Sequence, residues 1–194
     1  MTVSAAKQPS NVRFNGLDTA ALMQTVDVIK GDKTLARFEF RANNQWLGGV
    51  ENRSTIQDFY GAGGEDTSRT RPFTFTTDEP PVLLGNNRGA NPAEFLLHAL
   101  AGCVTSTTVM HATARGIRID SITTELSGDV DLQGVLGLDE SVRPGFQQIT
   151  MKMDIKADCG DAELDELLKF VHAHSPVCDT VCRPVPVTLV RIRA

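Results

Sequence analysis

The chain has 194 residues, of which 41% are hydrophobic and 22% charged, a composition typical of one globular domain with an extension or of two small domains. The formal net charge of −5 argues against nucleic acid or an anionic membrane as a partner, because phosphate binding needs a surplus of Lys and Arg. The first residues lack the apolar run of a secretory signal, and no stretch approaches the roughly 18–20 apolar residues of a membrane span. We therefore expect a cytoplasmic protein whose cysteines rest as thiols: Cys103, Cys159, Cys178 and Cys182.

The first half of the chain predicts one short helix followed by strands. Asp18 is a favourable N-cap and Gly31 a stop signal, so a helix is expected from Asp18 to Lys30. Alternating apolar and polar side chains, separated by turn residues, predict strands over residues 35–42, 45–59 and 73–77. Gly and Pro are frequent from there to the next helix, which indicates a long loop.

The longest predicted helix covers residues 91–115. Asn91 is a good N-cap, and Pro92 fits the first helical position, where its missing N–H has no intrahelical acceptor to lose. Residues 95–101 are apolar nearly all round, a pattern typical of a helix buried in the middle of a domain or a dimer. Gly116 is expected to end this helix.

The second half of the chain predicts two long strands, a helix and a final strand. A period of two over residues 122–133 and 149–157 indicates strands with one wet and one dry face, joined as a hairpin by residues 134–145. Apolar residues at helical spacing predict an amphipathic helix over residues 161–174, and a last strand is expected over residues 185–193. This order of helices and strands predicts the α+β class.

Cys103 lies in the middle of the long helix and has two interpretations. It can be a small buried hydrophobic residue, as free cysteines often are. It can instead be a reactive thiol, but an apolar helix face disfavours the charged thiolate, so this hypothesis requires a nearby Arg or Lys. The residues that share its helix face at three- and four-residue spacing are Leu96, Ala99, Leu100, Ser106, Thr107 and Met110.

Two histidines and two cysteines gather within eleven residues near the end of the chain. Imidazole and thiolate suit Zn²⁺, so one interpretation is a structural zinc site made by His172, His174, Cys178 and Cys182. The C-x3-C spacing fits no common zinc motif, however. The alternatives are solvated histidines beside packed cysteines, or a redox role for Cys178 on a turn over residues 177–183. Cys159 is expected to be structural.

Two motifs of this chain resemble the OsmC/Ohr family. The first is Asn-Pro-Ala-Glu-Phe-Leu-Leu at residues 91–97, and the second is Ala-His-Ser-Pro-Val-Cys at residues 173–178. The similarity covers roughly residues 35–194, so we expect an N-terminal extension over residues 1–31 and an OsmC-like domain over residues 32–194. The resemblance implies antiparallel sheets packed around a buried central helix, in an intertwined homodimer.

The same resemblance implies a thiol peroxidase that reduces organic hydroperoxides without a metal or flavin cofactor. Cys103 matches the reactive cysteine of the family and Cys178 the resolving one. Cys182 is a candidate for a spare resolving thiol, since it lies one turn after Cys178 if that segment is helical. An external dithiol, often of the lipoyl type in this family, would reduce the disulfide that Cys103 and Cys178 form. A protein of the same fold that only binds apolar small molecules remains the alternative.

Active members of the family also carry an Arg that polarises the peroxide and a carboxylate that holds it. Arg53 is the first choice for this Arg and Arg88 the second. Glu94 lies nine residues before Cys103, about 180° away on an ideal helix, so it would act through the Arg or across a dimer. Otherwise Glu94 is simply a favourable carboxylate in the first helical turn.

Overall fold

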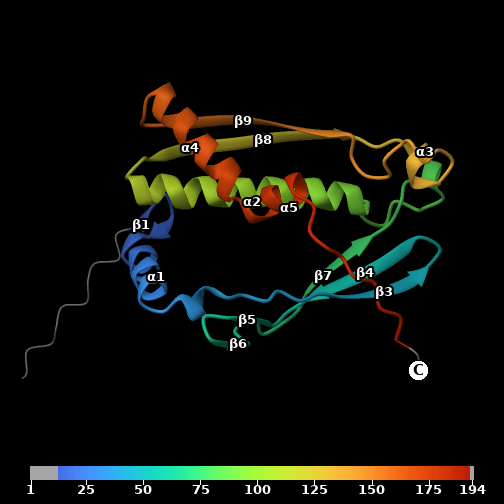
Figure 1. The fold of residues 1–194 in the computed structure, drawn as a ribbon, viewed down its shortest axis with the longest axis horizontal. Coiled ribbons are helices and arrows are strands. Elements are labelled where there is room, and N and C mark those ends of the chain that lie inside the picture. Colours follow the sequence, from blue (N-terminus) through green and yellow to red (C-terminus); the bar gives the residue numbers. More distant parts are fainter. Residues whose placement is uncertain (1–12, 193–194) are drawn as a thin grey trace, which may run out of the picture. The chain divides into compact units, whose positions relative to one another are not determined.

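The structure, a computed structural model, describes residues 13–192 (Figure 1). The chain divides into two compact units, Met1–Leu96 and Leu97–Ala194. Within the described residues, five α-helices accompany small antiparallel sheets. This arrangement confirms the mixed helix-and-strand class that the order of sequence patterns predicts.

The first unit begins with a small hairpin and a capped helix. Strand β1 (Arg13–Phe14) pairs antiparallel with β2 (Leu17–Asp18), and helix α1 (Thr19–Gly31) follows at once. The Asp18 carboxylate accepts a hydrogen bond of 3.0 Å from the backbone N–H of Ala21, which satisfies one of the free amides at the helix start. The predicted helix and its N-cap are therefore confirmed.

A three-stranded antiparallel sheet forms the centre of the first unit. Its strand order is β3 (Asn43–Gly48), β4 (Glu51–Ile56) and β7 (Phe73–Thr77), and a second hairpin pairs β5 (Phe59–Gly61) with β6 (Gly64–Asp66). The strand expected over residues 73–77 is confirmed. The single strand expected over residues 45–59 is wrong, because Gly48 and Gly49 take φ values of 135° and 55° and turn the chain back into a hairpin.

The strand expected over residues 35–42 is also wrong. Its first residues form a 3-10 helix, η1 (Lys33–Ala36), which Asp32 caps by accepting a 2.9 Å hydrogen bond from the Thr34 N–H. In the rest of this range, one isolated antiparallel bridge pairs Glu39 with Tyr60. The alternating apolar residues instead contribute to a cluster of rings, with centroids 5.5–6.3 Å apart, formed by Phe38, Phe40 and Phe59.

A buried carboxylate holds the loop that precedes the long helix. Asp78 is 1% exposed and accepts hydrogen bonds from the backbone N–H groups of Glu79, Asn86 and Arg88. These bonds, that of Arg88 first, hold the pKa of the Asp78 carboxyl below its usual value. The loop contains a second 3-10 helix, η2 (Pro81–Leu83), and lies against β7, where Gly89 approaches the backbone of Thr76.

Helix α2 (Pro92–Arg115) has the boundaries that the sequence predicts. Asn91 and Glu94 form a reciprocal capping box, in which the side chain of each accepts a 2.8 Å hydrogen bond from the backbone N–H of the other. Gly116 follows the helix with a φ of 74°, the left-handed conformation common just after a helix end.

Only one face of α2 is buried, which qualifies the expectation of an apolar helix enclosed on all sides. Its buried residues recur at three- and four-residue spacing, while Met110 on another face is 45% exposed. By length and composition α2 could cross a membrane, contrary to the sequence expectation, because its long run of Leu, Ala and Val is interrupted by few charges. This is weak evidence, since the core helix of a soluble protein passes the same test.

A long hairpin forms the sheet of the second unit. Strand β8 (Ile119–Asp129) pairs antiparallel with β9 (Gln148–Ala157), which confirms the two predicted strands. The first strand ends earlier than expected, because the Asp131 carboxylate accepts from the N–H of Gln133 and caps a short helix, α3 (Leu132–Val135). The polar faces of the strands are exposed, and the apolar faces turn to the core.

Helix α4 (Asp161–His174) confirms the predicted amphipathic helix, and α5 (Pro176–Cys182) replaces the expected turn over residues 177–183. Pro176 cannot donate an N–H, so it ends α4 but fits the first position of α5. The core of the second unit lies between α2, α4, α5 and the dry face of the hairpin (Figure 1). Its buried members are Leu100, Val104, Ala112, Ile117, Leu167, Val171 and Cys178.

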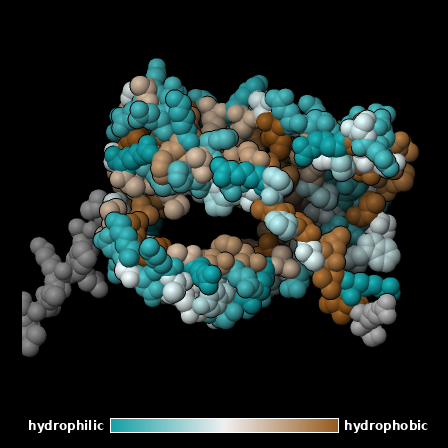
Figure 2. Space-filling model, viewed as in Figure 1, coloured by the Kyte–Doolittle hydropathy of each residue, from teal (hydrophilic) through white to brown (hydrophobic). Residues whose placement is uncertain are grey.

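The last segment forms no strand within the described residues. Residues 183–192 form no helix or strand, so the strand expected over residues 185–193 is not formed within the described part of the chain, and its last residue lies outside that part. Figure 2 shows hydrophobic side chains gathered along this segment. They are highly exposed: Val187 79%, Leu189 93%, Val190 77% and Ile192 90%. A strand is stable only when it pairs with a neighbouring strand, and no described strand pairs with this segment.

Candidate active site

Cys103 lies half-buried in the middle of α2, and two donors face its sulfur. The Ser175 hydroxyl donates a hydrogen bond to Sγ at 3.1 Å, and the backbone N–H of Val177 donates to the same atom at 3.5 Å. Both donors come from the junction between α4 and α5, 72 and 74 residues away along the chain. Cys103 is therefore more than a small residue filling a gap, because specific polar groups converge on its sulfur.

The backbone fixes Ser175 in this position. The residue is fully buried, its N–H donates to the carbonyl of Val171 at 2.8 Å, and its own carbonyl accepts from Asp179 at 2.9 Å. A serine at the start of a helix usually caps it with its hydroxyl, but Ser175 makes no such capping bond to α5. Its hydroxyl is directed to Cys103 instead.

This arrangement suits a sulfur that acts as an acceptor and a nucleophile. The thiolate is the reactive form of cysteine, and it accepts hydrogen bonds from hydroxyl and amide donors. Neither Ser175 nor the amide of Val177 was among the predicted site residues. The sequence carries one signal for the Val177 amide. Pro176 has no N–H, so the first backbone donor at the start of α5 is the N–H of Val177.

Cys178 and Cys182 lie on successive turns of α5. Their sulfur atoms are 4.0 Å apart, and Cys178 is buried whereas Cys182 is exposed. Burial, together with the hydrogen bond to Cys182, raises the pKa of the Cys178 thiol to about 11. Cys178 is therefore protonated at neutral pH, and it is not the group that would attack a peroxide first.

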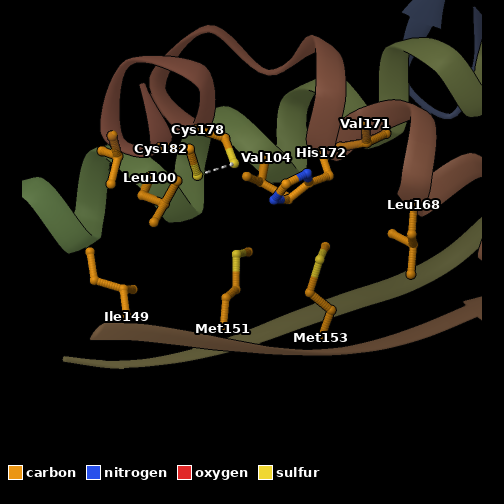
Figure 3. A pocket seen from close by; sticks show the side chains of 11 residues that line it. Leu100, Val104, Ile149, Met151, Met153, Leu168, Val171, His172, Cys178 and Cys182 are labelled. Carbon is orange, nitrogen blue, oxygen red and sulfur yellow. Dashed lines mark hydrogen bonds between the residues drawn. The ribbon is translucent and has the colours of Figure 1, made fainter. Parts of the chain in front are cut away.

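An apolar cavity of about 420 Å³ adjoins these thiols within the second unit. Figure 3 shows Met151 and Met153 rising from β9 toward His172 and the two cysteines of α5. The remaining walls are aliphatic side chains from α2, β9, α4 and α5: Leu100, Val104, Ile149, Leu168, Val171 and Val181. A cavity of this size and lining can bind a small apolar molecule.

Three of the four residues considered as zinc ligands lie together. The ligand atoms of His172, Cys178 and Cys182 are all within 4.8 Å of one another. His174 is engaged elsewhere, because its ring stacks on Phe170 with centroids 3.8 Å apart and its Nδ1 lies 2.7 Å from the Phe170 carbonyl. A site made by all four residues is therefore not formed.

The predicted charged residues belong to the first unit. Glu94 is used in the capping box with Asn91, which is the structural role that the sequence left open for it. Arg88 pairs with Glu51 at 3.1 Å, and Arg53 is exposed on β4. The assignment of Arg53 and Glu94 to the reaction stays a prediction, as does the pairing of Cys103 with Cys178.

Cys159 follows β9 and packs against the core of the second unit. Burial and the neighbouring carboxylates raise the pKa of its thiol, with desolvation as the larger cause. A thiol of this kind is a weak nucleophile at neutral pH. The position agrees with the structural role expected for Cys159.

His111 predicts a pH dependence of stability. Its ring packs on Phe170, with centroids 4.7 Å apart, and it faces Arg115 and His174. Burial, then these two groups, lower the pKa of His111. The unfolded chain therefore binds a proton more readily, so the free energy of unfolding should fall as the pH drops below about 6.5, the ordinary histidine pKa.

The measurement is urea unfolding at pH 7.5 and 5.5. His111→Phe should lose less stability between the two pH values than the natural chain, because the group that protonates on unfolding is gone. Ser106→Ala, on the same helix, removes no titratable group; it is the control and should keep the full pH dependence. If the free energy of unfolding of His111→Phe falls between pH 7.5 and 5.5 as much as that of the natural chain, His111 is not the group that causes the pH dependence.

The fold and these contacts define a small mixed α/β protein with a thiol centre on its longest helix. A family model described as OsmC-like protein matches residues 85–190, more than half of the chain. The chain belongs to the OsmC-like family, which confirms the resemblance drawn from the motifs around residues 91–97 and 173–178. Membership in this family supports a redox role in general terms.

Solved structures share the fold at low sequence identity. An OsmC-like protein from Mycoplasma pneumoniae is 18% identical, with 75% of this chain and 89% of that chain covered and a TM-score of 0.57. An organic hydroperoxide resistance protein OsmC from Legionella pneumophila is 15% identical, with 75% and 89% covered and a TM-score of 0.52. An OsmC-like protein of unknown function from Vibrio cholerae is 10% identical, with 73% and 92% covered and a TM-score of 0.53. No curated protein matches the chain by sequence.

Proposed function

We propose that this protein is a cysteine-based peroxidase that reduces organic hydroperoxides to alcohols, with Cys103 as the nucleophile. The observation that carries the proposal is the pair of donors, the Ser175 hydroxyl and the Val177 amide, at the Cys103 sulfur. The proposal also draws on the likeness to the Legionella pneumophila protein, which is named for organic hydroperoxide resistance.

The first step is a displacement at oxygen. The Cys103 thiolate attacks the distal peroxide oxygen, which carries the hydrogen, the O–O bond breaks, and the alkoxide leaves and takes up a proton to become an alcohol. Cys103 is thereby oxidised to a sulfenic acid. Arg53, held by Glu94, is our candidate for polarising the peroxide, and in a homodimer either subunit can supply it.

The second step closes a disulfide. The Cys178 sulfur attacks the Cys103 sulfenic acid, and the hydroxyl leaves as water with the proton that the Cys178 thiol carries at neutral pH. An external dithiol of the lipoyl type then reduces the disulfide by exchange and is itself oxidised to a disulfide. Alternatively, the Cys182 thiol, whose sulfur is 4.0 Å from that of Cys178, can attack the Cys178 sulfur of the disulfide, which forms a Cys178–Cys182 bond and releases Cys103 as a thiol.

The decisive experiment maps disulfides by mass spectrometry. Reduced protein receives one equivalent of cumene hydroperoxide, and free thiols are then trapped. A bond between Cys103 and Cys178 that forms within seconds is the expected result. If all four thiols stay free while the peroxide persists, the peroxidase proposal fails.

The apolar cavity predicts a preference for apolar peroxides. A hydrocarbon tail that leaves water for the cavity gains roughly 0.8 kcal/mol for each buried CH₂ group, whereas hydrogen peroxide has no such group. Cumene hydroperoxide should therefore oxidise Cys103 at least about ten times faster than hydrogen peroxide does. Stopped-flow measurement of both rate constants tests this, and equal rates would contradict the selectivity.

Ser175→Ala should slow the reaction of Cys103. The variant removes a donor to the sulfur, and hydrogen bonds to charged groups contribute about 1.5–3 kcal/mol, so the rate constant with cumene hydroperoxide should fall about tenfold or more. The matched control is Ser106→Ala, whose hydroxyl donates to the Cys103 carbonyl at 3.1 Å rather than to the sulfur. Equal rates in the two variants would show that Ser175 does not assist the sulfur.

We further propose a cytoplasmic homodimer. Exposed apolar side chains on α2 and along residues 185–192 are unusual for a chain that acts alone, and they are the kind of surface that a second copy covers. The acidic net charge remains the argument against nucleic acid as a partner.

A binding protein for apolar small molecules remains the second candidate. The cavity of about 420 Å³ favours it, because such a pocket can hold a ligand whether or not Cys103 turns over. Titration with a fluorescent apolar probe, compared between the natural chain and Cys103→Ser, separates the two functions. Binding without peroxide consumption by the natural chain would support the second candidate.

A further inference from the structure

The second unit carries a cluster of soft metal-binding groups that the proposed reaction does not use as a set. His172 lies in the last turn of α4, and Cys178 and Cys182 lie on successive turns of α5. Their ligand atoms are within 4.8 Å of one another, and Figure 3 shows all three side chains on one side of the cavity. The short break at Ser175 between the two helices brings the imidazole and the thiols together.

The distances suit a tetrahedral zinc ion. With zinc–sulfur bonds of about 2.3 Å, two thiolates of a tetrahedral site lie about 3.8 Å apart. The sulfur atoms of Cys178 and Cys182 are 4.0 Å apart, so they need to move by only a few tenths of an ångström. His172 is exposed, so a rotation of its side chain can bring a ring nitrogen to a zinc ion held by the two sulfur atoms.

We propose that His172, Cys178 and Cys182 form a binding site for Zn²⁺ with one open coordination position. Three protein ligands and an open fourth position are typical of zinc sites that exchange a water or a substrate group, whereas structural sites are closed by four ligands. His174 is held by Phe170 and does not supply the fourth ligand. The open position is therefore left for water or for a donor atom of a molecule in the adjoining cavity.

Zinc at this site would compete with disulfide formation. A metal-bound Cys178 thiolate is engaged as a ligand, so it is withdrawn from Cys103 until the metal leaves. Cys103 itself is not one of the clustered ligands, and its sulfur faces Ser175 and Val177. We therefore expect bound zinc to protect the thiols of Cys178 and Cys182 from reaction and to leave the thiol of Cys103 accessible.

The test uses the full reduced chain and Co²⁺ as a spectroscopic probe for the zinc position. One Co²⁺ per chain should give the strong ligand-field bands of a tetrahedral ion and a thiolate charge-transfer band, and Zn²⁺ should remove both by displacement. Cys182→Ser and His172→Asn should each weaken zinc binding by roughly 100-fold or more, since even outer partners of a ligand contribute 10–100-fold. Both residues are exposed, so neither substitution removes core packing.

Matched controls separate this site from the other histidine and cysteines. His174→Asn, Cys159→Ser and Cys103→Ser should bind zinc as the natural chain does. In the natural chain, Zn²⁺ should slow alkylation of Cys178 and Cys182 by iodoacetamide, mapped by mass spectrometry, and leave Cys103 unaffected. Absence of the charge-transfer band, or loss of zinc binding in His174→Asn but not in His172→Asn, would overturn the proposal. Cys103→Ser removes the proposed nucleophile and keeps the three zinc ligands. The zinc proposal can therefore be tested in a chain without peroxidase activity, and either proposal can fail while the other holds.

Discussion

Cys103→Ser should consume cumene hydroperoxide at least about 1000-fold more slowly than the natural chain, because the variant lacks the nucleophile that attacks the peroxide oxygen. A serine hydroxyl in the same place still accepts the bonds from Ser175 and Val177, but it does not ionise at neutral pH as a thiol can. The measurement is peroxide loss in the presence of excess dithiol. The fold should be retained, because serine has the same shape as cysteine with a smaller terminal atom and therefore brings no clash.

The controls are the other two thiols near the cavity. Cys178→Ser should still react with one equivalent of peroxide, but its Cys103 sulfenic acid, deprived of the partner, should proceed to sulfinic acid in excess peroxide. Cys182→Ser should turn over normally if Cys178 alone resolves the intermediate. If Cys103→Ser keeps its activity and Cys178→Ser loses the first turnover, the roles of the two cysteines are reversed.

Gly89→Ala should destabilise the first unit by about 3 kcal/mol or more, an effect at the upper end of those of single substitutions. A Cβ on Gly89 would lie 2.1 Å from the Thr76 carbonyl oxygen and 2.8 Å from its carbon, which are backbone atoms of β7 and cannot move aside as a side chain can. The loop held by Asp78 would have to leave the sheet. Urea unfolding followed by circular dichroism measures the loss.

Gly102→Ala is the matched control for this prediction. Gly102 lies within α2, and a Cβ added to it would meet no atom within 4 Å from any other described part of the chain, so alanine brings no clash. Alanine is the better helix former by about 1 kcal/mol, and the variant should be stabilised by up to that amount. A destabilised Gly102→Ala would indicate that a second subunit covers this face of α2, whereas a stable Gly89→Ala would contradict the close approach of the loop to β7.

Elements whose signals are local could be predicted from the sequence. The boundaries of α2 follow from Asn91, Pro92 and Gly116, all of which act on the residues beside them. The strands β8 and β9 follow from an alternation that is long enough to exclude a helix. The strand expected over residues 35–42 is wrong because the same alternation, over fewer residues, also fits aromatic side chains that pack on Phe59.

The site could be predicted only in part, because its contacts join residues distant in sequence. The sequence identifies Cys103 as a candidate nucleophile, but the bond from Ser175 spans 72 residues and depends on where α4 ends. Similarly, the sequence near the end of the chain makes His172 and His174 equally good candidates for a metal ligand beside the cysteines. Only the helix geometry separates them, placing one beside the cysteines of α5 and stacking the other on Phe170.

The unpaired segment over residues 185–192 has a consequence for how the chain resists aggregation. Among the described residues no strand pairs with this segment, and backbone donors and acceptors beside valine, leucine and isoleucine side chains can extend the edge of any sheet that they meet, including that of an unrelated protein. Pro184, just before the segment, and Pro186, within it, have no amide donor, and Arg183 and Arg191 place a charge on either side of residues 185–190. Prolines and charges beside an apolar run disfavour indiscriminate stacking of strands, and residues placed in this way are called gatekeepers.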